Sequence, residues 1–147
     1  MKFKYKAKNG EIDCELKYSD EGDFYTLYAF DGKDLMGFST FLFKNEYGIN
    51  KMWLQYIETK EQFAHKGVAT ALINIMEYIS YNNRVDKVEG KYYPKNEYAK
   101  PFYEKNGYDI DHEYYDWYID KRLDFNEVLK LKSNFVFENK KDEENLL

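Results

Sequence analysis

The chain has 147 residues, enough for one domain with a substantial hydrophobic core. Its formal net charge of −5 and the absence of a long basic cluster argue against nucleic acid as a partner. No apolar run approaches membrane length, and the N-terminus lacks the apolar segment of a signal peptide, so we expect a cytoplasmic protein. The single cysteine, Cys14, excludes an internal disulfide, and no cluster typical of a metal site is present in the sequence.

The first part of the chain is predicted to form antiparallel strands. Apolar and polar residues alternate, or apolar residues predominate, in five segments: residues 2–8, 12–18, 24–30, 36–43 and 51–58. The dipeptide Asn9-Gly10 is a strong hairpin signal between the first two segments. A turn at residues 31–34 joins the third and fourth strands.

A helix and a further strand follow. Apolar residues recur at helical spacing over residues 68–81, and a strand is expected near residues 85–93. A strand–helix–strand crossover implies that strands 51–58 and 85–93 are parallel, with room to splay apart.

The remaining residues predict one short helix, two strands and a C-terminal helix. Pro101 fits the first turn of the short helix, which Asn106-Gly107 ends. Closing strands are expected near residues 108–112 and 115–121. Asp124 and Glu127 fit a capping pair for a helix near residues 124–132, and the last ten residues predict a frayed, charged tail.

The segment before Gly67 predicts an anion site. A buried strand, a short loop containing this glycine and a helix N-terminus follow one another here. Free backbone N–H groups and the positive end of the helix dipole attract anions at such a place, phosphates above all. This pattern alone has little specificity.

A second motif makes the interpretation specific. The loop reads Ala64-His65-Lys66-Gly67-Val68-Ala69, and the later segment carries Asn96, Ala99, Tyr103, Glu104, Lys105, Gly107 and Tyr108. In this order the two motifs resemble the pyrophosphate loop and the later motif of the GNAT superfamily, the acetyl-CoA-dependent N-acetyltransferases, over roughly residues 24–123.

The resemblance implies an α/β (α+β) fold with a mainly antiparallel sheet, a central splayed parallel strand pair and flanking helices. The expected organisation is one GNAT-like domain over residues 1–147. Within it we expect an N-terminal hairpin (1–23), the family core (24–123) and a C-terminal helix with a charged tail (124–147).

The resemblance also implies the ligand and the reaction. The chain is expected to move an acetyl group from acetyl-CoA to a primary amine by direct attack, with Tyr103 as the general acid. The general base stays open between Glu58 and Glu89, which border the predicted splay. The residues expected to bind acetyl-CoA are Ile57, Thr59, His65, Lys66, Gly67, Val68, Ala69, Thr70, Asn96 and Tyr103.

Two departures from the family pattern bear on function. Ala64 stands where the family has Gln or Arg in the pyrophosphate loop. The two helices that normally follow the first strand of the family are replaced by the turn Ser19–Asp23. We therefore expect the wall of the acceptor-binding site to be formed by the helix near 124–132 or by a second subunit of a homodimer.

The acceptor and the activity itself leave alternatives. The amine could belong to a protein N-terminus or lysine, a polyamine, an aminoglycoside or a small metabolite. The alternative function is a catalytically weak or inactive GNAT-like module that binds CoA or acts in regulation through protein contacts.

Overall fold

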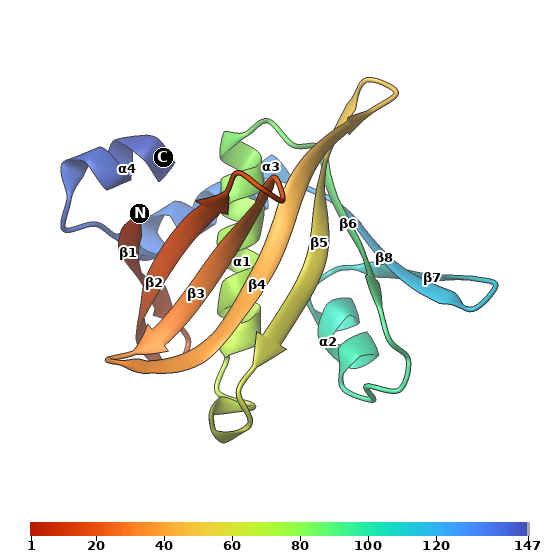
Figure 1. Ribbon diagram of the computed structural model, residues 1–147, viewed down its shortest axis with the longest axis horizontal. Helices are drawn as coiled ribbons and strands as arrows, with labels where there is room; N and C mark the ends of the chain where they lie inside the picture. The colour runs from red at the N-terminus through yellow and green to blue at the C-terminus, as the bar shows by residue number, and fades with distance from the viewer. Residues whose placement is uncertain (147) are drawn as a thin grey trace.

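The computed structural model describes residues 1–146 and shows a nine-stranded β-sheet with helix α1 against one face (Figure 1). The strands are β1 (Lys2–Ala7), β2 (Gly10–Ser19), β3 (Phe24–Asp31), β4 (Asp34–Glu46), β5 (Ile49–Thr59), β6 (Lys87–Tyr92), β7 (Asp109–Glu113), β8 (Asp116–Arg122) and β9 (Phe135–Val136). The α-helices are α1 (Val68–Asn82), α2 (Ala99–Lys105), α3 (Phe125–Leu129) and α4 (Lys140–Leu146). Short 3₁₀ helices η1 (Glu61–Phe63) and η2 (Lys130–Asn134) complete the chain.

The sheet confirms the predicted fold class. Its strand order is β7-β8-β6-β5-β4-β3-β2-β1-β9, and every neighbouring pair is antiparallel except β5 and β6. The parallel pairing is short, because it runs only from Lys51 with Lys87 to Leu54 with Gly90. β5 then continues to Thr59 without a partner on its β6 side, so the predicted splay is present.

A bulge in β5 decides which side chains point to each face beside the splay. Phe41 pairs with Leu54, but Thr40 pairs with Tyr56, so Gln55 is left without a counterpart. The register therefore places Leu54 and Ile57 on the face toward α1, and Tyr56 on the opposite face.

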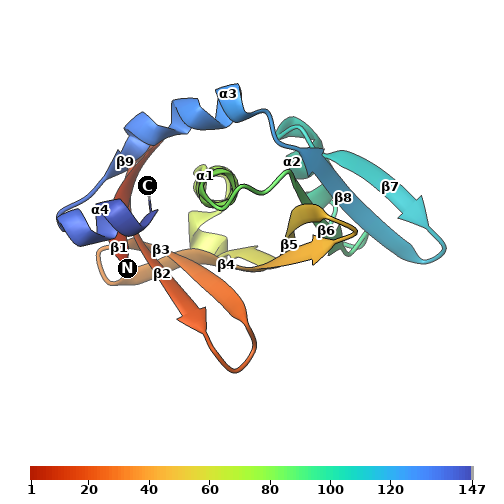
Figure 2. The ribbon, with the colours of Figure 1, turned by 90° about the horizontal axis from the view of Figure 1, so that it is seen from above.

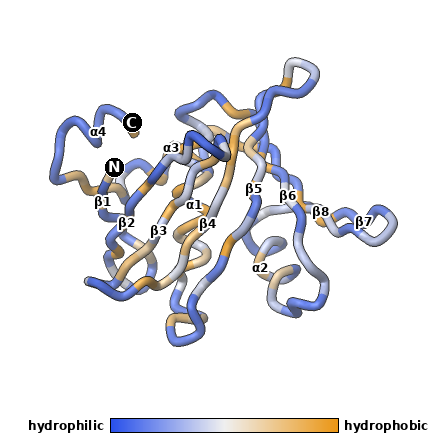
Figure 3. The backbone as a smooth tube through the Cα atoms, viewed as in Figure 1, coloured by the Kyte–Doolittle hydropathy of each residue, from blue (hydrophilic) through white to orange (hydrophobic). Residues whose placement is uncertain are grey.

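Helix α1 is buried on two sides. Figure 2 shows it between the sheet and the segment formed by α3 and η2. This explains why Leu72, Ile73, Ile75 and Met76, which cover more than one stripe of the helix, are all buried. Figure 3 shows the hydrophobic residues concentrated in α1 and the central strands, whereas α4 is mostly hydrophilic.

The other face of the sheet has no helix over its central strands (Figure 2). The connection between β2 and β3 is the predicted tight turn, residues 20–23, and no helix is inserted there. We call this uncovered surface of β3–β6 and β8 the open face.

The C-terminal segment does not lie where the sequence suggested. Phe125 of α3 packs on Tyr81, near the C-terminal end of α1, with ring centroids 5.4 Å apart. The splay lies near Val68, at the other end of this helix, about 20 Å away at 1.5 Å per residue. The prediction that this helix walls the acceptor side is therefore wrong, because α3 covers the back of α1 instead.

The predicted capping pair and frayed tail are also partly wrong. Asp124 does cap α3 by accepting a hydrogen bond from the Asn126 N–H, but Glu127 pairs with Lys130. The residues after η2 form β9, which pairs with β1, and then α4. Leu146 is only 4% exposed, because α4 turns this apolar side chain inward.

None of the helices in residues 1–146 is both long and apolar enough to span a bilayer.

Candidate active site

The loop before α1 has the geometry of an anion site. Gly67 is the N-cap of α1 and has a φ of 82°, a left-handed conformation that favours glycine. His65 also has a positive φ, 61°. The first N–H of the helix with a backbone acceptor is that of Ala71, which donates to the Gly67 carbonyl. Within the described chain, the N–H groups of residues 65–70 therefore have no hydrogen-bond acceptor and can receive a phosphate.

Gly67→Asp is expected to weaken acetyl-CoA binding at least ~10-fold, because it adds a negative charge beside the phosphate site. A Cβ at Gly67 meets nothing closer than the Asn9 Nδ2, 3.8 Å away, so space alone does not forbid the change. Gly67→Asn is the matched control, since it has the same size and tolerates a positive φ but carries no charge. Calorimetric titration of both variants measures the difference. Equal affinity of Gly67→Asp and Gly67→Asn would contradict the site.

The two sequence motifs meet in space. The His65 ring, in the loop before α1, packs edge-on against the Tyr98 ring, with centroids 5.6 Å apart. Tyr98 directly precedes α2, and the Asn96 side-chain oxygen accepts a hydrogen bond from the Tyr98 N–H. Asn96 thus shapes the turn before α2, and its contact with CoA stays a prediction. Lys66 is exposed, and its ammonium lies over the Phe63 ring.

Tyr103 lies on α2 among other aromatic side chains. Its ring centroid is 5.8 Å from that of Tyr92 and 5.8 Å from that of Tyr108. It is 4% exposed, and its hydroxyl makes no hydrogen bond within residues 1–146. Burial, with a smaller effect of Tyr92, raises the pKa of Tyr103 to about 12. The phenol therefore keeps its proton at neutral pH, as a general acid must.

The unpaired end of β5 offers further groups to a ligand. Backbone groups of residues 55–59 that point toward β6 have no strand partner, and these residues include Ile57 and Thr59. The Thr59 hydroxyl is buried without a hydrogen-bond partner in the described residues. Gly37 of β4 lets the end of β5 and the start of α1 lie close to this strand. A Cβ at this position would lie 2.6 Å from the Glu58 carbonyl oxygen and 3.2 Å from Val68 Cγ1.

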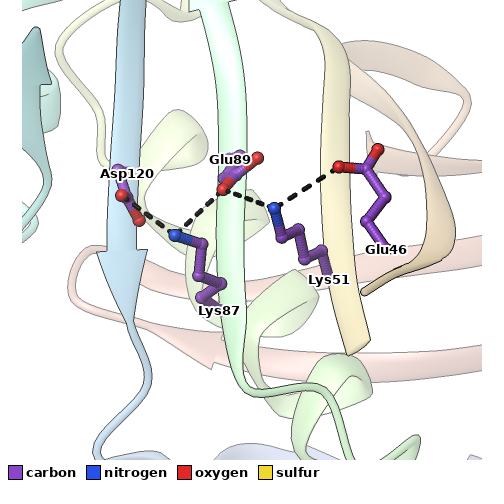
Figure 4. A network of polar contacts seen from close by, with 5 residues as sticks. All are labelled: Glu46, Lys51, Lys87, Glu89 and Asp120. Atoms are coloured by element: carbon purple, nitrogen blue, oxygen red, sulfur yellow. Dashed lines mark hydrogen bonds and ion pairs between the residues drawn. The ribbon is translucent and has the colours of Figure 1, made fainter. Parts of the chain in front are cut away.

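The two candidate bases differ in their surroundings. Glu89 bridges two lysines on the open face, at 3.0 Å from Lys87 and 3.3 Å from Lys51 (Figure 4). The network extends on to Asp120 and Glu46. Burial raises the pKa of Glu89, but the hydrogen bonds and charges of the two lysines outweigh it and leave the pKa lowered. Glu89 is thus a weak proton acceptor, and it pairs in register with Trp53, before the splay begins.

Glu58 lies inside the unpaired segment of β5. Its register partner is Phe38, and its side chain points to the open face with that of Tyr56. Its carboxylate is 3.2 Å from the Lys60 ammonium and accepts a hydrogen bond from the Tyr56 hydroxyl at 3.4 Å. Of the two carboxylates, only Glu58 borders the gap between the parallel strands.

Candidate site residues lie on both faces of the sheet beside the splay. Tyr103 packs on Tyr92, which lies four residues after the buried Val88 in β6 and therefore on the same face, the one toward α1. Glu58 lies on the open face. The Tyr103 phenol and the Glu58 carboxylate thus lie on opposite faces of the sheet beside the splay.

Sequence reasoning missed two groups near these residues. One is a row of aromatic rings on the open face that ends at Tyr56. The other is the ion pair between Glu77 of α1 and Lys121 of β8. A carboxylate on the apolar stripe of the predicted helix was the available signal for the second, because a buried charge needs a partner.

The comparisons with known proteins agree with this geometry. The sequence model described as the acetyltransferase (GNAT) family matches residues 3–108, well over half of the chain. The chain belongs to the GNAT acetyltransferase family. A search of curated proteins gives no significant match.

Solved structures share the GNAT fold at low sequence identity. The PaiA N-acetyltransferase of Thermoplasma acidophilum, in complex with coenzyme A, has 23% identity and a TM-score of 0.61, over 69% of this chain and 62% of that chain. Naa50 of Arabidopsis thaliana, bound to the bisubstrate analogue CoA-Ac-MVNAL, has 19% identity and a TM-score of 0.57, over 67% and 72%. An aminoglycoside acetyltransferase from an uncultured soil sample, in complex with trehalose, has 17% identity and a TM-score of 0.57, over 65% and 67%.

Proposed function

We propose that this GNAT protein transfers the acetyl group of acetyl-CoA to a primary amine by direct attack. The observation that carries the proposal is the splay of β5 and β6 beside the unpaired N–H groups before α1, with Glu58 on the unpaired part of β5. The residues fit acetyl-CoA, because residues 65–70 offer N–H donors to its diphosphate and Thr59 offers an unpaired hydroxyl. GNAT relatives bound to coenzyme A or a CoA bisubstrate analogue support the choice of donor.

Bound acetyl-CoA supplies a thioester whose acetyl carbon is attacked by the acceptor nitrogen, while the carbon–sulfur bond breaks and the sulfur leaves as a thiolate. Glu58 accepts the proton that the ammonium of the acceptor must lose. Tyr103 donates its phenolic proton to the departing sulfur, and the second proton that the nitrogen loses on forming the amide restores the phenol. A free N–H of β5 between Ile57 and Thr59 stabilises the negative charge that develops on the carbonyl oxygen.

The single cysteine is a poor nucleophile for a covalent acetyl intermediate. Cys14, the only cysteine, is buried on β2, and burial raises the pKa of its thiol. A thiol that stays protonated and enclosed is a poor nucleophile. We therefore favour direct attack in a ternary complex, which requires no nucleophile from the protein.

The alternative is a GNAT module that binds CoA without turnover. Ala64, which cannot contact a phosphate through a polar side chain, favours it. Tyr103 favours the enzyme, because its buried phenol stays protonated and can act as a general acid.

A free-thiol release assay with acetyl-CoA and a panel of amines tests the enzyme. We expect amine-dependent thiol release that exceeds the background hydrolysis of acetyl-CoA. The panel includes an aliphatic diamine, a lysine-containing peptide, a peptide with only a free N-terminus and an aminoglycoside. If calorimetry shows that acetyl-CoA binds but no amine causes thiol release, the protein is instead a module that binds CoA without turnover.

A further inference from the structure

Helix α2, which carries Tyr103, has few buried side chains of its own to hold it in place. It has seven residues, and only Ala99 and Tyr103 among them are buried. The segment before it, residues 93–98, is exposed throughout. A helix this short is not stable by itself and takes its position from contacts with the rest of the protein. The place of the Tyr103 phenol therefore depends on what holds the C-terminal end of α2.

The Lys121 ammonium holds that end. Lys121 lies in β8 opposite the buried Val88 of β6, so its side chain lies on the face toward α1. Its Nζ donates a hydrogen bond to the carbonyl oxygen of Asn106, the C-cap of α2, at 2.9 Å. The Asn106 N–H in turn donates to the Tyr103 carbonyl oxygen at 3.1 Å. The ammonium is thus linked to the backbone of Tyr103 through one intervening residue.

The same ammonium also contacts α1 and the aromatic ring beside Tyr103. It forms an ion pair with Glu77 of α1, whose side chain is 5% exposed. It lies 5.3 Å from the centroid of the Tyr108 ring, and that centroid is 5.8 Å from the centroid of the Tyr103 ring. Because α1 begins at the loop with the free N–H groups, Lys121 fixes the helix of the general acid relative to the helix of the anion site.

We propose that Lys121 is a positioning residue for acetyl transfer, which with Glu77 ties α2 to α1 and so holds the Tyr103 phenol in place for proton donation to the sulfur. The inference rests on the proposed function and adds a residue to it. The sulfur and the diphosphate belong to one ligand, so a shift of α2 relative to α1 moves the phenol away from the sulfur. A misplacement of about 1 Å can lower a rate by a factor on the order of 10².

The test variant combines Glu77→Gln with Lys121→Met. It removes both charges and leaves no buried charge unpaired, so it is expected to fold where Lys121→Met alone is strongly destabilised. We expect its kcat to fall about tenfold or more, with a KM for acetyl-CoA within about twofold of wild type. Lys121→Arg keeps a positive charge and hydrogen-bond donors and is expected to retain most of kcat. Glu127→Gln with Lys130→Met, which removes an exposed ion pair on the far side of α1, is the matched control and is expected to turn over as the wild type does.

A cycle with Tyr103→Phe separates positioning from a structural role. If Lys121 acts through the phenol, adding the Glu77→Gln and Lys121→Met changes to Tyr103→Phe is expected to lower kcat by less than about twofold further. An ion pair that only stabilises the fold would cost the same factor with and without the Tyr103 hydroxyl. Equal losses in the two backgrounds, or a wild-type kcat in the test variant, overturn the inference, while amine-dependent thiol release by the wild type still supports the proposed function.

A measurement without turnover completes the test. In protein labelled with ¹³C at the tyrosine Cζ, the resonance of Tyr103 is identified by its absence in Tyr103→Phe. With CoA bound, we expect this resonance to shift in the test variant and to stay in place in the matched control. An unchanged resonance in the test variant overturns the inference even if no amine is acetylated. A shifted resonance with no thiol release from the wild type for any amine refutes the proposed function and with it the role of Lys121 in the reaction.

Discussion

Tyr103→Phe is expected to lower kcat by ~10²–10⁴, the range that removal of a general acid typically costs. The phenol is buried on α2, and its pKa of about 12 keeps the proton in place at pH 7. Phenylalanine keeps the ring and its packing on Tyr92 and Tyr108, so folding and acetyl-CoA affinity are expected to change little. Single-turnover acetyl transfer with the best amine of the panel, together with calorimetry for acetyl-CoA, measures both effects.

Tyr108→Phe provides the control for this prediction. Tyr108 is also buried, it packs on Tyr103, and its hydroxyl has no hydrogen-bond partner in residues 1–146. Removing that hydroxyl is expected to leave kcat within about twofold of wild type. If Tyr103→Phe turns over as fast as Tyr108→Phe, Tyr103 is a packing residue and the thiolate leaves without help from the protein.

Lys121→Met is expected to destabilise the fold by ~3–5 kcal/mol, because it leaves the Glu77 carboxylate buried without a counter-charge. Glu77 lies on α1 and its side chain is 5% exposed. The Lys121 ammonium also donates to the Asn106 carbonyl, at the end of α2, and lies over the Tyr108 ring. Methionine keeps most of the stem and removes the charge. Urea unfolding at pH 7 measures the loss of unfolding free energy.

The pKa of Glu77 predicts how the loss of stability in Lys121→Met changes with pH. Burial raises the pKa of Glu77, and the charge and hydrogen bond of Lys121 offset part of the rise. Without Lys121 the pKa is expected to rise further. Between the unfolded pKa and this raised value the folded state binds more protons, so stability falls as pH increases through that interval. The deficit of Lys121→Met against wild type is therefore expected to be smaller near pH 5 than at pH 8.

A double variant separates the buried charge from lost packing. Glu77→Gln with Lys121→Met removes both charges and is expected to recover part of the stability that Lys121→Met loses. Lys130→Met, which breaks the exposed pair with Glu127, is expected to change stability little, because solvent screens that pair. A loss for Lys121→Met no larger than that of Lys130→Met would show that the Glu77 pair contributes little.

Local patterns in the sequence predicted most of the sheet and the loop before α1. Alternation of apolar and polar residues gave β1 and β2, and the Asn9-Gly10 turn gave their hairpin. Helical periodicity after Gly67 predicted α1, and the crossover rule predicted the parallel strand pair with its splay. These features depend on residues close in sequence or on a general rule of connectivity, so a single sequence carries them.

Features that depend on contacts between distant residues were not predictable. The bulge at Gln55 reverses the faces of the last part of β5, which places Ile57 toward α1 and Glu58 on the open face. An alternating pattern without the bulge would have put Glu58 on the side of Leu54. The choice between Glu58 and Glu89 depends on the two lysines around Glu89, which come from different strands. The places of α3 and β9 likewise depend on packing rather than local signals.

The pairing of β9 with β1 joins two segments that lie far apart in the sequence at one edge of the sheet. Lys4 faces Val136 there, and the Asn134 side chain donates to the Tyr5 hydroxyl. On a ribosome, β1 leaves the exit tunnel long before its partner exists. The edge of β1 must stay unpaired until β9 has been synthesised, which exposes it to other chains. Contacts of such long sequence separation also slow folding, so the pairing of β9 with β1 is expected to be a late step in the folding of the domain.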